Sequence, residues 1–327
     1  MPLPPDELGR AAEALSTAQR VVLVCHVNPD ADAMGSMLGL AGVLAKRGTT
    51  VAASFPNGLG EGPRWLEALP GREHLVEPRD IPKDAQVLVT LDAAHPDRLG
   101  GLGHLLQKVP VSICIDHHRT NDGFGTINLV DHEASSTAEV VFRLVERMGD
   151  EVDANVAACL YAGLVTDTGR FQFEATTPEV LRLAAHLREQ PFDHSGLSQA
   201  LYEDSSLPYL RLLGRLLERI QHVPEADLVW TYVTRKDLDE GKVPIQETDD
   251  LIDIVRTARE ADVAAVIKEQ REGGFKVSMR SRGKTDVAAV SAAQGGGGHR
   301  LAAGYASKTG LEDTVRTLVQ ALTAVRS

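Results

Sequence analysis

The sequence predicts an α/β protein of two domains, the first built on a doubly wound parallel sheet. Short apolar runs typical of buried strands alternate with amphipathic stretches typical of helices, and this alternation favours parallel strands joined by crossover helices. A chain of 327 residues suits two domains that each bury their own core. We expect the first domain over residues 1–190, a helical linker over 191–224 and a smaller α/β domain over 225–327.

The first domain is expected to begin with a helix and then to alternate strands with helices. Strands are expected over 21–25, 49–54, 85–92 and 109–116, and helices over 7–18, 33–47, 136–148 and 155–166 and from 178 onwards. Residues 59–72, rich in Gly and Pro, read as a loop with one helical turn. Asp32 lies where the N-cap of the second helix belongs, Ser136 and Glu139 have capping-box spacing, and Gly149 ends that helix.

The second domain is expected to follow a helix over 205–222, where leucines recur at helical spacing. The expected strands cover 228–233, 263–269 and 275–279, and the expected helices cover 251–258, 285–293 and 311–325. The last two strands form a hairpin whose turn is 271–274.

Composition and charge exclude several classes of protein. Hydrophobic residues make up 43% of the chain and charged residues 24%, which is typical of a globular protein and not of a disordered one. A net charge of −12 argues against binding to duplex nucleic acid, which needs a basic face. With only 4% aromatic residues, the chain offers little for a long groove that stacks single-stranded bases.

The sequence indicates a cytoplasmic protein that does not bind membranes. Residues 1–7 lack a basic segment followed by an apolar one, and no apolar run reaches the length of a membrane span. Cys25, Cys114 and Cys159 all lie in apolar runs, so we expect buried thiols in a reducing compartment. The oligomeric state is left open, with a homodimer as one option.

Six histidine and aspartate residues lie at or beyond the ends of apolar elements in the first domain: His26, Asp30, Asp32, Asp92, His117 and Asp167. In a doubly wound sheet these ends converge on one crevice. Two imidazoles and four carboxylates suit two Mn²⁺ or Mg²⁺ ions, because four negative charges balance two divalent cations. Two such ions that share a carboxylate can activate water and stabilise an in-line displacement at phosphorus. For any single aspartate, the alternative is a helix cap or a turn.

Asp116 and His118 flank His117 and need separate roles. Because side chains alternate along a strand, His117 can face the crevice while its neighbours point away. Asp116 can orient an imidazole. His118 can bind a phosphate oxygen or act as a general acid.

A second candidate site is the glycine run that ends at His299. Glycines let backbone amides approach an anion closely, and the following imidazole adds a donor. Arg280 supplies a guanidinium that can bind phosphate with two hydrogen bonds. A flexible glycine loop and an exposed Arg-Ser-Arg turn are the alternatives. The candidate substrate-binding residues are Arg280, Gly296, Gly297, Gly298 and His299.

These motifs, in this order, resemble the DHH phosphoesterase family with its C-terminal DHH-associated domain. The motifs are His26-x-Asn-Pro-Asp30-x-Asp32, Asp92, Asp116-His117-His118, Asp167-Thr-Gly, and Gly295 to His299 with Ala302-Ala303-Gly304. They span nearly the whole chain. The branch that it most resembles contains oligoribonucleases (nanoRNases) and pAp phosphatases, and the likeness extends to RecJ-like nucleases. The inorganic pyrophosphatase branch shares the first-domain motifs but not the glycine run with its histidine.

The resemblance implies two Mn²⁺ ions, with Mg²⁺ also open. The implied ligands are His26, Asp30 and Asp92 for one ion and Asp32, Asp92, His117 and Asp167 for the other, with Asp92 bridging them. It also implies that His118 faces the scissile phosphate. Arg280 and the glycine run with His299 would hold the substrate from the second domain, which puts the active site in the interdomain cleft.

The activity that the resemblance implies is hydrolysis of short oligonucleotides and linear dinucleotides to mononucleotides, of pAp to AMP, or of both. Three alternatives stay open. The chain could be a soluble phosphodiesterase for cyclic dinucleotides such as c-di-AMP, an exonuclease on longer single strands, or a nucleotide-binding regulator without catalytic activity.

Overall fold

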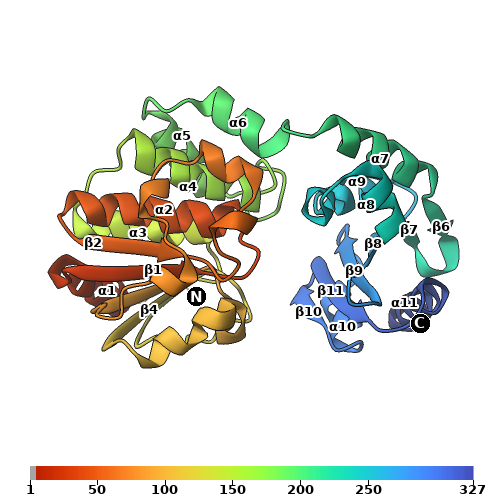
Figure 1. Ribbon diagram of the computed structural model, residues 1–327, viewed down its shortest axis with the longest axis horizontal. Helices are drawn as coiled ribbons and strands as arrows, with labels where there is room; N and C mark the ends of the chain where they lie inside the picture. The colour runs from red at the N-terminus through yellow and green to blue at the C-terminus, as the bar shows by residue number, and fades with distance from the viewer. Residues whose placement is uncertain (1–4, 327) are drawn as a thin grey trace. The chain divides into compact units, whose positions relative to one another are not determined.

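The computed structural model describes residues 5–326, and the chain divides into two compact units between Asp204 and Ser205 (Figure 1). The predicted linker, 191–224, is shared between these units. Helix α6 (His194–Tyr202) belongs to unit 1. Helix α7 (Leu207–Glu218) belongs to unit 2, where its Leu212 and Leu216 are fully buried.

Unit 1 is built on a five-stranded parallel sheet, which confirms the fold class predicted for it. The strands are β1 (Arg20–Cys25), β2 (Thr50–Ser54), β3 (Val87–Leu91), β4 (Val111–Asp116) and β5 (Ile127–Val130). Their order in space is β2-β1-β3-β4-β5, so the next two strands in the chain, β2 and β3, pair with opposite edges of β1. The order therefore switches between β1 and β3, which is where open α/β sheets bind their ligands.

Alternating side chains of β1 contact different layers on the two faces of this sheet. Val21, Leu23 and Cys25 join the core under the α-helices, whereas Val22 and Val24 join a smaller core on the other face. The helices are α1 (Pro5–Thr17), α2 (Ala31–Lys46), α3 (Thr137–Met148) and α4 (Ala154–Asp167), with α5 (Pro178–Arg188) packed on α4. The smaller core includes Leu99 and Leu102 of the 3-10 segment η5 (Pro96–Gln107) and Ile81, which follows the 3-10 turn η4 (Pro78–Asp80).

Several local boundaries match the prediction and others differ from it. Ser136 caps α3 and Gly149, with φ 73°, ends it, as expected. The N-cap of α2 is Asp30, whose side chain accepts a hydrogen bond from the Ala33 N–H, so the expectation that Asp32 caps this helix is wrong. Asn28, with φ 52°, turns the chain early enough for α2 to begin at residue 31. Strand β5 was not expected, because four residues are too few to show a clear period.

The segment 59–72, expected to be a loop with one helical turn, contains three 3-10 turns: η1 (Leu59–Glu61), η2 (Arg64–Ala68) and η3 (Arg72–His74). None of the helices in residues 5–326 is long and apolar enough to cross a membrane. All three cysteines are buried free thiols, as predicted.

Unit 2 contains a six-stranded mixed sheet, which confirms a second, smaller α/β part of the chain. Its strands are β6 (Gln221–Val223), β7 (Leu228–Val233), β8 (Val263–Glu269), β9 (Phe275–Ser281), β10 (Gly297–His299) and β11 (Ala302–Ser307), in the order β10-β11-β9-β8-β7-β6. Only β7 and β8 are parallel among these described pairs. One face packs on α7, α8 (Arg235–Gly241) and α9 (Leu251–Val255), and the other on α10 (Val287–Ala292) and α11 (Leu311–Arg326). Two short 3-10 turns, η6 (Pro224–Ala226) and η7 (Ile245–Thr248), complete the unit.

Glycines allow α2 and α4 to cross at very short range. A Cβ added to Gly35 of α2 would lie 2.3 Å from the carbonyl oxygen of Cys159 in α4. The same Cβ would lie 3.3 Å from the backbone nitrogen of Gly163. Because a carbonyl oxygen of a helix cannot move away by itself, any side chain at residue 35 would push the two helices apart.

We predict that Gly35→Ala destabilises the protein by about 1–3 kcal/mol, the usual cost of overpacking a core. Gly42→Ala on the same helix is the matched control, because its Cβ would meet only Val156 at an ordinary 3.6 Å. There the better helix propensity of alanine should leave stability unchanged or raise it by up to about 1 kcal/mol. Urea unfolding followed by circular dichroism measures both, and equal stabilities for the two variants would contradict the prediction.

Candidate metal centre

The structure brings the six predicted metal ligands together at the carboxyl ends of β1, β3 and β4. Loops after these strands carry His26 and Asp30, then Asp92, then His117. The helices supply the other two residues: Asp32 lies in the first turn of α2, and Asp167 is the last residue of α4. Their nitrogen and oxygen atoms form overlapping groups within 4.8 Å: His26, Asp30 and Asp92; Asp32, His117 and Asp167; and Asp92, His117 and His118.

Asp92 lies in the middle of this cluster and its two oxygens face different partners. Its Oδ2 lies 3.5 Å from His26 Nε2. Its Oδ1 lies 3.6 Å from His117 Nε2 and 3.4 Å from His118 Nδ1. Asp30 completes the first side, 3.7 Å from His26 Nε2, and Asp167 the second side, 3.0 Å from His117 Nε2. One buried carboxylate therefore links two groups of ligand-type atoms.

The backbone at Asp92 adopts an uncommon conformation that lets the chain leave β3 sharply. Asp92 has φ 57°, in the left-handed region, and its N–H donates to the carbonyl of Ile115 on β4. Such a residue costs of order 1–3 kcal/mol and persists only where its surroundings hold it. Aspartate is one of the residues that tolerate this region best.

Backbone carbonyls orient the two histidines. His26 Nδ1 lies 2.8 Å from the carbonyl oxygen of Val27, and Arg98 Nη2 lies 3.0 Å from the same ring nitrogen. His117 Nδ1 lies 3.3 Å from the carbonyl oxygen of Ala134. In both rings the Nε2 atom faces carboxylates, which is how metal-binding histidines are usually held.

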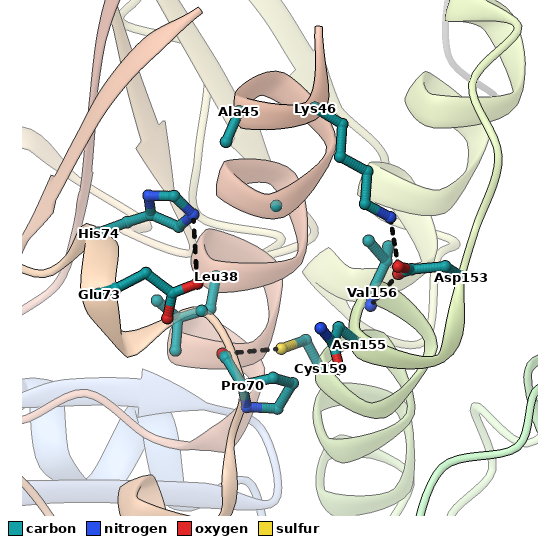
Figure 2. Close-up of a pocket in the computed structure, with 12 residues that line it drawn as sticks. Leu38, Ala45, Lys46, Pro70, Glu73, His74, Asp153, Asn155, Val156 and Cys159 are labelled. Atoms are coloured by element: carbon teal, nitrogen blue, oxygen red, sulfur yellow. Dashed lines mark hydrogen bonds and ion pairs between the residues drawn. The ribbon is translucent and has the colours of Figure 1, made fainter. Parts of the chain in front are cut away.

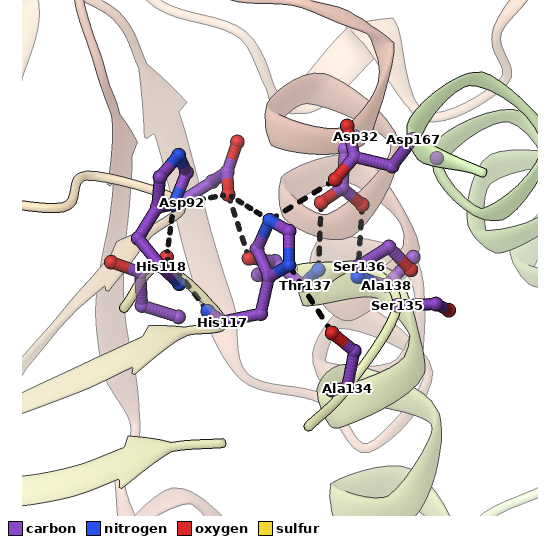
Figure 3. A network of polar contacts seen from close by, with 12 residues as sticks. Asp32, Asp92, His117, His118, Ala134, Ser135, Ser136, Thr137, Ala138 and Asp167 are labelled. Atoms are coloured by element: carbon purple, nitrogen blue, oxygen red, sulfur yellow. Dashed lines mark hydrogen bonds and ion pairs between the residues drawn. The ribbon is translucent and has the colours of Figure 1, made fainter. Parts of the chain in front are cut away.

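Asp116 lies behind the cluster and orients His118. Its Oδ1 accepts a hydrogen bond from His118 Nδ1 at 2.7 Å and from the His117 N–H at 2.8 Å. Its Oδ2 accepts from Asn121 Nδ2 at 2.6 Å (Figure 3 shows the side of the cluster with His117 and His118). Asp116 is fully buried. The ring of His118 is thereby fixed edge-on to the ring of His117, with centroids 4.8 Å apart.

The protonation of the cluster reflects its crowded carboxylates. Burial and the charges of Asp92 and Asp167 raise the pKa of Asp32 well above its usual range. Burial alone would lower the pKa of His26, but Asp30 and Asp92 raise it to about 10. Burial alone would raise the pKa of Asp92, but the hydrogen bond with His26 and the charges of His118 and His117 lower it to about 2. The pKa of His117 is likewise raised, because Asp167 outweighs the effect of burial.

These residues fit a divalent cation. Four carboxylates converge where the buried ones have little access to water, and such an arrangement is favourable when positive charge is shared among them. Imidazole nitrogens and carboxylate oxygens are together suited to Mn²⁺ and related first-row ions, and carboxylates alone to Mg²⁺. The cluster can therefore bind metal.

The predicted substrate-binding residues lie in unit 2. Arg280 is on β9 and His299 ends β10. The glycine run, expected as a loop, forms part of β10, and close packing against β11 requires two of its glycines. A Cβ at Gly296 would lie 2.2 Å from the Gly304 carbonyl oxygen, and one at Gly298 would lie 2.5 Å from that of Ala302.

The residues around the cluster that were not predicted include Arg98, which contacts His26, Asn121, which contacts Asp116, and Thr137, which contacts Asp92. Arg98 lies in the 3-10 segment η5 and Asn121 in an irregular segment after β4, and no periodicity of the sequence marks either residue. Thr137 directly follows the predicted cap Ser136, so its position at a helix start was visible, but its contact with Asp92 was not.

A pocket of about 310 Å³ opens elsewhere on unit 1 and contains none of the cluster residues. Figure 2 shows it between α2 and the start of α4, where Lys46 pairs with Asp153 and the thiol of Cys159 points to the carbonyl of Pro70. The functional residues therefore do not coincide with this hollow.

Comparison with known proteins identifies both units. The model of the DHH family, N-terminal domain, matches residues 20–164, and that of the DHHA1 domain matches residues 230–325. A bifunctional oligoribonuclease and PAP phosphatase NrnA from Thermus thermophilus is 35% identical over 98% of this chain and 94% of its own length.

Two solved structures show the same fold. An exopolyphosphatase-related protein from Bacteroides fragilis is 26% identical, with a TM-score of 0.92 over 98% of this chain and 97% of that one. RecJ from Thermus thermophilus, in complex with Mn²⁺, is 18% identical, with a TM-score of 0.56 over 99% of this chain and 55% of that one. At this identity the likeness to RecJ concerns the fold alone.

We predict that metal uptake releases protons. With a pKa of about 10, His26 carries a proton at pH 7 that a cation must displace, so raising the pH favours binding. The apparent affinity for Mn²⁺ should rise about tenfold per pH unit for each proton released between pH 6 and pH 8. Titration calorimetry in two buffers of different ionisation enthalpy measures the protons, and an affinity that does not change with pH would argue against the prediction.

Proposed function

The chain belongs to the DHH family, and from this we propose that it is a Mn²⁺-dependent phosphoesterase that acts on short oligonucleotides, linear dinucleotides and pAp. The observation that carries the proposal is the position of Asp92, whose two oxygens face His26 on one side and His117 and His118 on the other. The NrnA relative, similar over almost its entire length, supports this choice of substrates.

We propose two cation sites that share Asp92. The first uses His26, Asp30 and Asp92, and the second uses Asp32, Asp92, His117 and Asp167. When bound, two divalent cations supply Lewis acidity to the phosphoryl group and to the attacking water. Hydrolysis then joins the water oxygen to phosphorus and breaks the bond to the leaving oxygen, which takes up a proton.

His118 is proposed to hold a phosphate oxygen of the substrate. Its Nδ1 donates to Asp116, and we propose that its other ring nitrogen, Nε2, contacts the phosphate. Burial alone would lower the pKa of His118, but Asp116 and Asp92 raise it, which favours the protonated, donating form of the ring. A cationic donor here stabilises the charge that develops on the phosphoryl oxygens.

Arg280 and His299 are proposed to bind a further phosphate of the substrate. In the sheet of unit 2, His299 pairs with Ala302, and Ala302 pairs with Arg280. Residues directly opposite in antiparallel strands share a face, so Arg280 and His299 lie on the same face on either side of Ala302. Two strand spacings separate their Cα atoms by about 10 Å. Arg280 shares the carboxylate of Asp253 with Arg256, at 3.7 Å and 3.6 Å. Because two guanidinium groups share one carboxylate, the group of three carries a net positive charge, which favours the approach of an anion.

A cytoplasmic location and the lack of binding to duplex nucleic acid stay predictions from the sequence, and a homodimer stays one option for the oligomeric state. A panel of pAp, linear dinucleotides, cyclic dinucleotides and longer RNA and DNA, incubated with Mn²⁺, tests the proposed substrates. Rapid release of mononucleotides from the short substrates and of AMP from pAp is expected. Selective hydrolysis of cyclic dinucleotides or of long strands would replace the proposed substrates, and no hydrolysis of any of them would overturn the enzymatic role.

Asp92→Asn should lower Mn²⁺-dependent hydrolysis at least about 100-fold, because the amide cannot bridge two cations with two anionic oxygens. Asp97→Asn is the matched control, since Asp97 follows the same strand but its side chain is 93% exposed and lies outside the cluster. Initial rates with a dinucleotide substrate measure the effect. Near-normal activity of Asp92→Asn would rule out the proposed shared ligand.

Arg280→Ala should raise KM about tenfold or more and change kcat much less, because a phosphate contact away from the reacting bond contributes mainly to binding. Arg316→Ala serves as the control, since Arg316 is an exposed arginine of unit 2 that pairs with Asp313. Steady-state kinetics on pAp separate the two constants. A fall in kcat with KM unchanged would show that Arg280 does not act as proposed.

A further inference from the structure

The first turn of α3 contacts two carboxylates of the proposed cation sites: Asp92, which both sites share, and Asp32, which belongs to the second. The Thr137 hydroxyl donates to Asp92 Oδ1 at 2.8 Å. The Thr137 N–H donates to Asp32 Oδ2 at 2.6 Å, and the Ala138 N–H donates to Asp32 Oδ1 at 2.9 Å. Figure 3 shows these contacts together with His117 and Asp167. All three donors come from one helical turn.

Helix geometry explains why these amides meet Asp32. The first N–H groups of a helix have no partner inside the helix. The cap residue Ser136 accepts from the Glu139 N–H, which leaves the amides of Thr137 and Ala138 to other acceptors. Asp32 is fully buried and supplies one oxygen to each amide. The positive end of the helix dipole also favours this anion.

Helix α4 packs closely against Asp32 at Gly163. A Cβ at Gly163 would lie 2.5 Å from Asp32 Oδ1 and 2.9 Å from Ala138 Cβ. Because residue 163 is a glycine, there is room for the carboxylate of Asp32 to reach the first turn of α3. The two amide hydrogen bonds fix Asp32 relative to α3, and the hydroxyl of Thr137 fixes Asp92 relative to the same helical turn.

We propose that Thr137 is a positioning residue of the metal centre, which fixes the carboxylate of Asp92 relative to Asp32 so that two cations bind at once. The inference rests on the proposed function. It assigns a role to a residue that is not itself a ligand.

The hydroxyl of Thr137 is the critical group because Asp92 has competing partners. With Oδ1 held by Thr137, Oδ2 stays directed at His26. Without that hydrogen bond, the carboxylate can turn about its Cβ–Cγ bond, because its contacts with His26, His117 and His118 are all longer, at 3.5, 3.6 and 3.4 Å. It can also chelate a single cation with both oxygens. In either position it no longer serves the two sites together.

The test compares Thr137→Val, which keeps the shape and removes the donor, with Thr137→Ser, which keeps the donor. Thr231→Val is the matched control, because Thr231 is an equally buried threonine of unit 2 that donates to the Leu216 carbonyl. Each full-length protein is freed of metal and titrated with Mn²⁺. Binding is followed by calorimetry, and the coupled Mn²⁺ pair by electron paramagnetic resonance.

We expect wild type, Thr137→Ser and Thr231→Val to bind two Mn²⁺ and to show the spin-coupled signal. Thr137→Val should bind the second Mn²⁺ about 10–100-fold more weakly, as is usual when the partner of a metal ligand is removed. Its coupled signal should appear only at correspondingly higher Mn²⁺. Its hydrolysis of a dinucleotide should then recover at that Mn²⁺ concentration, with KM for the nucleotide unchanged.

Two results would overturn the inference while leaving the proposed function intact. One is a Thr137→Val protein that binds both ions as wild type does. The other is a metal-free Thr137→Val protein that unfolds much more readily than Thr231→Val, with no rescue of the second site by serine, since the role would then be structural. Failure of the wild type to bind Mn²⁺ or to hydrolyse any nucleotide would instead overturn the proposed function.

Discussion

Repulsion between buried carboxylates is the constraint on which the arrangement of unit 1 depends. Asp32 and Asp92 are almost fully buried. Asp30 lies beside His26, and Asp167 lies beside His117. Like charges at such distances are costly unless donors and cations offset them. The protein places imidazoles between the carboxylates and the amide end of a helix behind Asp32. The arrangement of the cluster therefore depends on the surrounding secondary structure as much as on its own side chains.

The sheet topology explains why these groups meet. Because β3 lies on the opposite side of β1 from β2, the loops after β1 and β3 leave the sheet at its switch point and diverge around a common space. The close crossing of α2 and α4 then brings Asp32 and Asp167, from opposite ends of two helices, to the same space. Gly35 and Gly163 contribute no side chain to the cluster. Because they have none, α2 and α4 can cross closely enough to bring Asp32 and Asp167 together.

The sequence predicts these strands and the residues that gather at their ends, because each apolar run ends on a residue with distinctive chemistry, as at His26, Asp92 and Asp116. The start of α2 was misplaced by two residues, since the left-handed turn at Asn28 leaves no pattern in the sequence. Thr137 was missed for a different reason: its partner lies 45 residues away, and only tertiary packing brings them together. The glycine run was not expected as a strand, because glycine has low β-propensity and its pairing depends on β11.

The line of residues across β10, β11 and β9 has a consequence for the proposed choice of substrate. Arg280 and His299 are held apart by two strand spacings, which no substitution can alter, but the volume between them is set by the single methyl group of Ala302. If Arg280 and His299 bind the substrate as proposed, a change at this position would alter which phosphate group fits and would leave the acidic cluster of unit 1 untouched. Substrate preference would then depend on one small side chain of unit 2, and hydrolysis on residues of unit 1.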